Sequence, residues 1–169
     1  DNFYADVLTE GLDDENRESR LAAIQSVGMV GAKNALPKLK SLLKSSQYSD
    51  ERLAITISTG YIGDTSSVPF LRELLYDEEP NIRWDAAVGL AKMGDTSSVF
   101  IIENLLDRNY LSSFPELSPS EIDQVISTAI YVTSILKHDR FYSKLKGLTL
   151  DENLKIRNAV IKTIEKTYQ

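Results

Sequence analysis

Hydrophobic residues recur along this chain at spacings of three and four positions, which is the period of one face of an α-helix. Three stretches share this pattern almost position for position, and they begin at Arg20, Arg52 and Arg83, at offsets of 32 and 31 residues. So many matched positions do not arise by chance, and they indicate an internal repeat. The matched hydrophobic positions include Leu36/Val68/Val99, Leu39/Leu71/Ile102, Leu42/Leu74/Leu105 and Leu43/Leu75/Leu106.

Each repeat is predicted to form two helices joined by a short turn. The first hydrophobic stretch ends at Gly31, Gly63 or Gly94, and glycine commonly ends a helix because it adopts the left-handed conformation. An Asp-Thr-Ser-Ser run follows the last two glycines and supplies oxygens that cap the next helix. Pro37 and Pro69 then fall in the first turn of the second helix, the part of a helix that tolerates proline.

Weaker copies of the pattern extend it toward both ends of the chain. Ser118 and Glu121, with proline directly after the serine, form a capping box that starts a further helix after a less regular stretch. We expect one domain, with a leading half-repeat over residues 1–13, three regular repeats over 14–107, an irregular loop over 108–118, and two degenerate or incomplete repeats over 119–169.

The period, the paired helices and the recurring Arg, Ala and Gly-Asp columns resemble HEAT-like repeats of the bacterial type that is also found in phycobilisome lyases. The resemblance covers residues 3–167 and implies an all-α fold, an α-α superhelix (a HEAT-like α-solenoid) of about four to five helix-pair repeats. Three positions depart from the pattern. Phe100 stands where the other repeats have proline, and the fourth repeat has Ile126 in the Arg column and Lys137 in the Gly column.

The resemblance also implies that the second helix of each repeat lines the concave side of the superhelix. Solvent-facing positions of these helices vary between repeats while the core positions do not, as expected of a binding face on a constant scaffold. They mix aromatic residues with charges of both signs, which suits a protein surface better than a polyanion. We therefore predict a non-catalytic scaffold that binds a protein or peptide partner. The residues expected to contact it are Lys40, Lys44, Phe70, Arg72, Glu73, Tyr76, Ile101 and Glu103.

Several of these residues also have a purely structural interpretation. Phe70 and Ile101 can instead pack against the adjacent repeat, and Trp84, which shares a column with two leucines, is expected to do so. The repeated arginine column lies near acidic residues at the start of each first helix. We therefore expect it to form ion pairs between repeats rather than a phosphate site.

The formal charge of −6 is concentrated at the start of the chain, where residues 1–18 hold seven acidic residues and one basic residue. The remainder is neutral overall, so it lacks the broad basic surface that nucleic-acid binding needs. Residues 19–49 contain five basic residues and no acidic one. That strip is more simply a solvated helix face, although a weak nucleic-acid-binding module stays open as an alternative.

Motifs for catalysis, cofactors or metal ions are missing from the sequence. The chain has no cysteine and one histidine, His138, which excludes a thiol nucleophile and paired-histidine zinc motifs. We therefore predict no enzyme activity of its own, no cofactor and no metal. The alternative is an accessory subunit of a lyase-type or other helical-repeat enzyme.

The cellular context is only weakly constrained. No apolar run approaches the roughly 18 residues of a membrane span, so we expect a soluble protein, and a monomer. The chain begins at Asp1 rather than at methionine, which is compatible with a fragment or with a mature protein whose signal has been removed. A cytoplasmic location is expected in preference to export.

Overall fold

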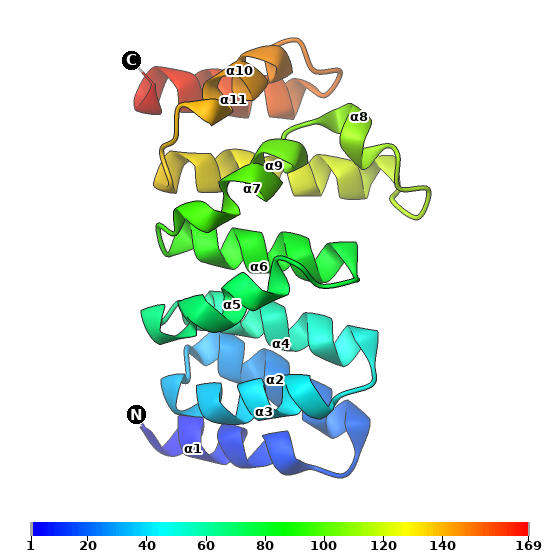
Figure 1. Ribbon diagram of the computed structural model, residues 1–169, viewed down its shortest axis with the longest axis vertical. Coiled ribbons are helices and arrows are strands. Elements are labelled where there is room, and N and C mark those ends of the chain that lie inside the picture. Colours follow the sequence, from blue (N-terminus) through cyan, green and yellow to red (C-terminus); the bar gives the residue numbers. More distant parts are fainter. Residues whose placement is uncertain (1, 169) are drawn as a thin grey trace.

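The computed structural model describes residues 2–168. Within this range the chain forms α-helices and short 3-10 turns and no β-strand, which confirms the predicted all-α fold. The helices stack along one axis, and the chain runs from one end of the stack to the other (Figure 1). No helix among the described residues is long and apolar enough to cross a membrane.

Two rows of helices build the stack, and the second row lies in front in Figure 1. We call their outward surfaces the first-helix face and the second-helix face. The first row consists of α2 (Arg17–Val30), α4 (Ser49–Ile62), α6 (Pro80–Lys92), α9 (Pro119–Ile135) and α11 (Leu154–Thr167). The second row consists of α1 (Asn2–Glu10), α3 (Leu36–Ser45), α5 (Val68–Leu74), α7 (Val99–Leu105) and α10 (Arg140–Leu148).

The turns between paired helices form as the sequence predicts. Gly31, Gly63 and Gly94 have φ angles of 68°, 64° and 78°, in the left-handed region that favours glycine. The carboxylates of Asp64 and Asp95 accept hydrogen bonds from backbone N–H groups two residues later, which caps the 3-10 turns Thr65–Ser67 and Thr96–Ser98. Each turn leads directly into a second-row helix.

The side chains of the repeated hydrophobic columns form one continuous core. Leu71 and Ile102 are fully buried, and Leu105 and Leu106 are 1% exposed. This burial confirms the predicted register. Each repeat thus covers the apolar faces of its neighbours, which a single helix pair could not do alone.

Helices of the first row pack directly on one another through small residues. A methyl group added at Gly28 would lie 2.7 Å from the Cβ of Ser58, and one at Gly89 would lie 3.0 Å from the Cα of Gly60. The second-row helices α3 and α5 instead pack mainly against the first row.

Residues 108–118 were expected to be an irregular loop, but they begin with the short helix α8 (Arg108–Leu111). Leu111 is fully buried, and Phe114 packs edge-on against Trp84 with ring centroids 4.9 Å apart. Arg108 forms salt bridges to Asp123 and to the buried Asp151. The segment is therefore an ordered insertion that packs between the third and fourth repeats, and Trp84 packs against it as a structural residue.

Candidate functional site

The variable charged column of the second helices joins successive repeats. Lys40 donates a hydrogen bond to the carbonyl oxygen of Ser66 at 3.3 Å. Arg72 forms a salt bridge with Asp95 at 2.5 Å, and Glu103 forms one with Arg140 at 2.6 Å. These side chains therefore form contacts within the protein, between one repeat and the next. Periodicity places them outside the core of their own repeat, but it does not show that the next repeat reaches them.

Phe70 does not lie on an accessible surface. Its side chain is 7% exposed, and the ammonium group of Lys40 lies 5.7 Å from the centre of its ring. Phe70 therefore packs against the adjacent repeat, which was the alternative expected from the sequence, and it offers little surface to a partner. Ile101 is partly buried against the core as well. Lys44, Glu73 and Tyr76 are exposed.

An aromatic groove remains open between α5 and α7 on the second-helix face. Its rim carries Tyr76, 87% exposed, and Phe100, 63% exposed. The cavity has a volume of about 520 Å³, which can hold one or two side chains of a partner. We call it the α5–α7 groove. Its lining comprises Leu75, Tyr76, Arg83, Trp84, Ser97, Phe100, Ile101, Asn104 and Tyr110.

The structure thus brings together two of the predicted site residues, Tyr76 and Ile101, and adds Phe100. In the sequence, Phe100 replaces the proline that the first two repeats have at this position, and this replacement is the feature that could have identified it as a site residue. A large apolar residue that replaces a structural proline, and that the core does not cover, is a candidate for contact with another molecule.

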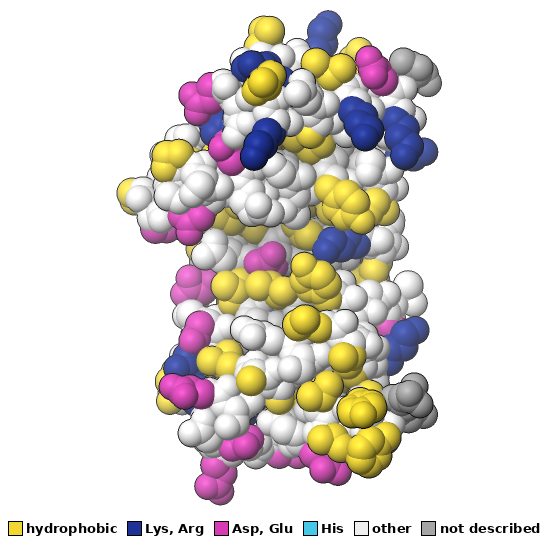
Figure 2. Space-filling view, turned by 180° about the vertical axis from the view of Figure 1, so that it is seen from behind, with side chains coloured by type: hydrophobic (Ala, Val, Ile, Leu, Met, Phe, Trp, Pro, Cys, Tyr) yellow, Lys and Arg dark blue, Asp and Glu magenta, His cyan; other side chains and the backbone are white. Residues whose placement is uncertain are grey.

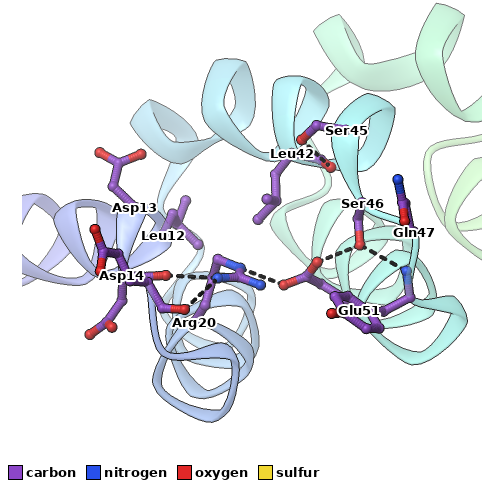
Figure 3. Close-up of a pocket in the computed structure, with 11 residues that line it drawn as sticks. Leu12, Asp13, Asp14, Arg20, Leu42, Ser45, Ser46, Gln47 and Glu51 are labelled. Atoms are coloured by element: carbon purple, nitrogen blue, oxygen red, sulfur yellow. Dashed lines mark hydrogen bonds and ion pairs between the residues drawn. The ribbon is translucent and has the colours of Figure 1, made fainter.

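A second, polar cavity of about 540 Å³ lies where the first and second repeats meet (Figure 3). The guanidinium of Arg20 points at Glu51, at 2.5 Å, and also donates to the carbonyl oxygen of Asp14 at 2.7 Å. The hydroxyl of Ser46 donates to the other oxygen of Glu51. Arg20, Glu51 and Ser46 therefore satisfy one another and join the two repeats.

The other arginines of this column are structural too. Arg52 forms a salt bridge with Asp77, and Arg83 donates to the carbonyl oxygens of Asp77 and Glu78 at 2.7 and 2.9 Å. Arg157 makes the equivalent bonds in the last repeat. The predicted role in joining repeats is confirmed for Arg20 and Arg52, while the other two hold the turn before their own helix.

The first-helix face carries an apolar region. Figure 2 shows hydrophobic side chains gathered over its middle, with few charges among them. A groove of about 600 Å³ runs between α2 and α4, with Met29, 86% exposed, and Tyr61, 66% exposed, on its edges. The ammonium group of Lys92 lies 4.5 Å from the ring centre of Tyr61. No group of acidic or histidine side chains among residues 2–168 has the arrangement of a metal site.

Asp85, on this face, is an acidic residue at a position where the two preceding repeats have alanine, Ala22 and Ala54. Burial raises its pKa from 3.8 to about 6, and the charge of Lys92 only partly opposes this. No side chain within residues 2–168 forms a hydrogen bond or salt bridge with it. The carboxylate therefore destabilises the fold at neutral pH.

Replacing Asp85 by asparagine should raise the free energy of unfolding at pH 7.5 by about 1–3 kcal/mol, and the gain should vanish near pH 4. The native state binds the extra proton between the unfolded pKa of 3.8 and the folded pKa of about 6. Wild-type stability therefore falls as pH rises through this window, and the variant lacks that loss. Urea unfolding of both proteins at pH 4 and 7.5 measures the difference. A gain of equal size at both pH values would contradict this origin, and Glu73→Gln is the exposed control.

Stacked helix pairs with left-handed glycine turns define the protein as an α-solenoid. The sequence model of the family described as HEAT repeats matches residues 49–111. Over these residues the chain carries HEAT-type repeats.

Solved structures share the fold, and 34 of their chains match significantly. A chain from the complex of CpcE and CpcF of phycocyanin lyase from Nostoc sp. PCC7120 superposes with a TM-score of 0.74 at 15% sequence identity. The match covers 96% of this chain but 64% of the other, so this chain spans less than two thirds of that protein's length. At this identity the likeness concerns the fold, and at that level it confirms the resemblance to phycobilisome-lyase repeats. No curated protein matches the sequence significantly.

Proposed function

We propose that this protein is a non-catalytic scaffold that binds a protein or peptide partner through the α5–α7 groove. The observation that carries the proposal is the exposure of Tyr76 and Phe100 at the rim of a cavity on the second-helix face. Arg72 and Glu103, on either side, are neutralised by the next repeat. The groove therefore leaves apolar surface of this face open to a partner.

The chemistry of the groove favours a peptide with a large apolar side chain. Aromatic residues and arginine are enriched among the residues that supply most of the binding energy at protein interfaces, and aromatic rings bury much area. Phe100 and Tyr76 offer this area, while Asn104 and Ser97 provide hydrogen-bonding groups beside it. An apolar anchor seated between the two rings, with the peptide backbone near the polar groups, satisfies both features.

Phe100→Pro should remove the aromatic wall and leave the fold intact. The same Thr-Ser-Ser-Val turn precedes Pro69 in the second repeat, so proline fits the backbone at this place. We expect the free energy of unfolding to stay unchanged or to rise by up to about 1 kcal/mol. We will select peptides against the wild-type chain from a phage-displayed library. Their affinity for Phe100→Pro should be lower by about tenfold or more, which corresponds to a loss of about 1.4 kcal/mol or more of binding free energy.

The matched control is Tyr131→Ala, which removes an aromatic side chain, 59% exposed, from α9. Fluorescence anisotropy with labelled peptides, together with urea unfolding of each variant, gives affinity and stability on the same samples. Equal affinity of wild type and Phe100→Pro would show that the peptides bind outside the α5–α7 groove. A loss of affinity in Tyr131→Ala alone would place it on the first-helix face.

A second candidate function is that of an accessory subunit of a lyase-type enzyme. Its support is the structural likeness to a chain from a two-protein complex of phycocyanin lyase, over 96% of this chain. On this hypothesis the partner is a second helical-repeat subunit, and the pair acts on phycocyanin while neither chain does so alone. Activity assays of the separate and mixed subunits test it.

A further inference from the structure

A groove of about 300 Å³ lies between α6 and α9, at the place where the insertion interrupts the regular stacking. We call it the α6–α9 groove. Its walls are largely apolar and come from four parts of the chain, among them Leu105 at the end of α7. Trp84 and Val88 belong to α6, Val125 to α9, and Leu117 to the end of the insertion. It is separate from the α5–α7 groove, although Trp84 borders both.

The side chains that line the α6–α9 groove include two carboxylates and no cation. Asp85 lies on α6 and Glu121 on α9. One oxygen of Glu121 accepts from the backbone N–H and the hydroxyl of Ser118 at the start of α9, and these bonds lower its pKa, so it is ionised at neutral pH. Asp85 and Glu121 are the only titratable residues in the lining.

The cation on α6 whose charge opposes the pKa shift of Asp85 is Lys92, and it does not pair with this carboxylate. Lys92 lies two helical turns further on, and its ammonium group sits over the ring of Tyr61 on α4. The equivalent positions of other repeats carry Ala22, Ala54 and Ala159, which leave no charge to satisfy. The third repeat thus places an unpaired carboxylate at the wall of an apolar groove. This carboxylate lowers stability, and the stacking of the helices does not need it, because repeats with alanine at this position stack without it.

We propose that the α6–α9 groove binds a lysine or arginine side chain of a protein partner. The aliphatic stem of such a side chain packs along Trp84, Val88 and Val125, and its charged end meets Asp85. Glu121 adds negative potential from the opposite wall. This contact goes beyond the proposed peptide site, because it uses a different groove and a different chemistry of recognition.

Charge complementarity favours a cationic side chain over a purely apolar one in the α6–α9 groove. An apolar side chain would leave the carboxylate of Asp85 buried without a partner, which costs more than leaving the groove open. A cation on a long apolar stem satisfies the walls and the carboxylate together. Binding of the cation favours the ionised form of Asp85, so affinity should rise with pH as this group loses its proton.

The test uses a capped pentapeptide, Gly-Leu-Arg-Leu-Gly, and the same peptide with citrulline, a neutral isostere of arginine. Trp84 is the single tryptophan of the chain and borders both grooves, so its fluorescence reports binding in either one and the variants below distinguish them. We expect saturable binding of the arginine peptide, about tenfold or more tighter than that of the citrulline peptide at pH 7.5. This preference should shrink at pH 5.

Two variants complete the experiment on the intact chain. Asp85→Asn should abolish the preference for arginine while the protein stays folded, as urea unfolding will show. Glu73→Gln, an exposed acid on the second-helix face, should leave the preference unchanged. Phe100→Pro should also leave it unchanged, which separates this site from the α5–α7 groove. Equal affinity for the two peptides, absence of saturable binding, or a preference that survives Asp85→Asn would overturn the proposal.

Discussion

Replacing Glu51 by alanine should lower the free energy of unfolding by about 3–5 kcal/mol, because it leaves a partly buried guanidinium without its partner. The Glu51 side chain is 1% exposed and that of Arg20 is 16% exposed. Removal of Glu51 also leaves the hydroxyl of Ser46 without its acceptor. The loss falls at the contact between α2 and α4, on which the first repeat depends.

A double substitution separates the loss of the ion pair from the loss of packing. In Arg20→Met with Glu51→Leu no charge is buried, so we expect part of the stability to return, although the bonds of Arg20 to the turn before α2 are lost. Urea unfolding of Arg20→Met, of Glu51→Leu and of the double variant completes the thermodynamic cycle. Glu73→Ala, on an exposed acid, should change stability by less than about 0.5 kcal/mol. A similarly small effect of Glu51→Ala would show that the pair is solvated in solution.

Leu71→Ala should lower the free energy of unfolding by about 2–5 kcal/mol, because it opens a cavity in a core that neighbouring repeats share. Leu71 on α5 is fully buried, and its Cδ1 atom would lie 3.3 Å from a methyl group added at Gly89 on α6. The surrounding helices are held by close backbone contacts between α4 and α6, so they cannot collapse into the space.

Leu150→Ala is the matched control, since it removes the same atoms from a side chain that is 88% exposed. It should change stability by about 0.5 kcal/mol or less. Amide hydrogen exchange of Leu71→Ala should show faster exchange in α4 and α6 together, because the cavity weakens the contacts of both. Equal costs for the two leucines would mean that the assigned register of the repeats is wrong.

Much of the fold follows from local and periodic features of the sequence. Gly31, Gly63 and Gly94 end helices because a left-handed backbone is favourable at glycine, wherever the helix lies in the molecule. The repeated leucines face inward because their period matches that of the helix. Both features repeat every 31 or 32 residues, and so the stack of helix pairs could be predicted from the sequence.

The insertion and the outer surface could not be predicted in the same way. Residues 108–118 lack the repeat pattern, and their order depends on contacts with Trp84 and on the salt bridges of Arg108 to distant carboxylates. Such contacts join residues far apart in the sequence, and no periodicity encodes them.

The sequence by itself determined the helix pairs, their turns and the inward face of each helix, because these depend on backbone preferences and on the helical period. Only the tertiary structure decided which outward side chains stay accessible, because this depends on the distance and rotation between neighbouring repeats. Phe70 and Phe100 both lie outside the apolar stripe of their own helix, yet the first is covered and the second is exposed. The same geometry opens the α6–α9 groove beside Asp85, where α6 and α9, separated by the insertion, stack less closely than α2 with α4 or α4 with α6.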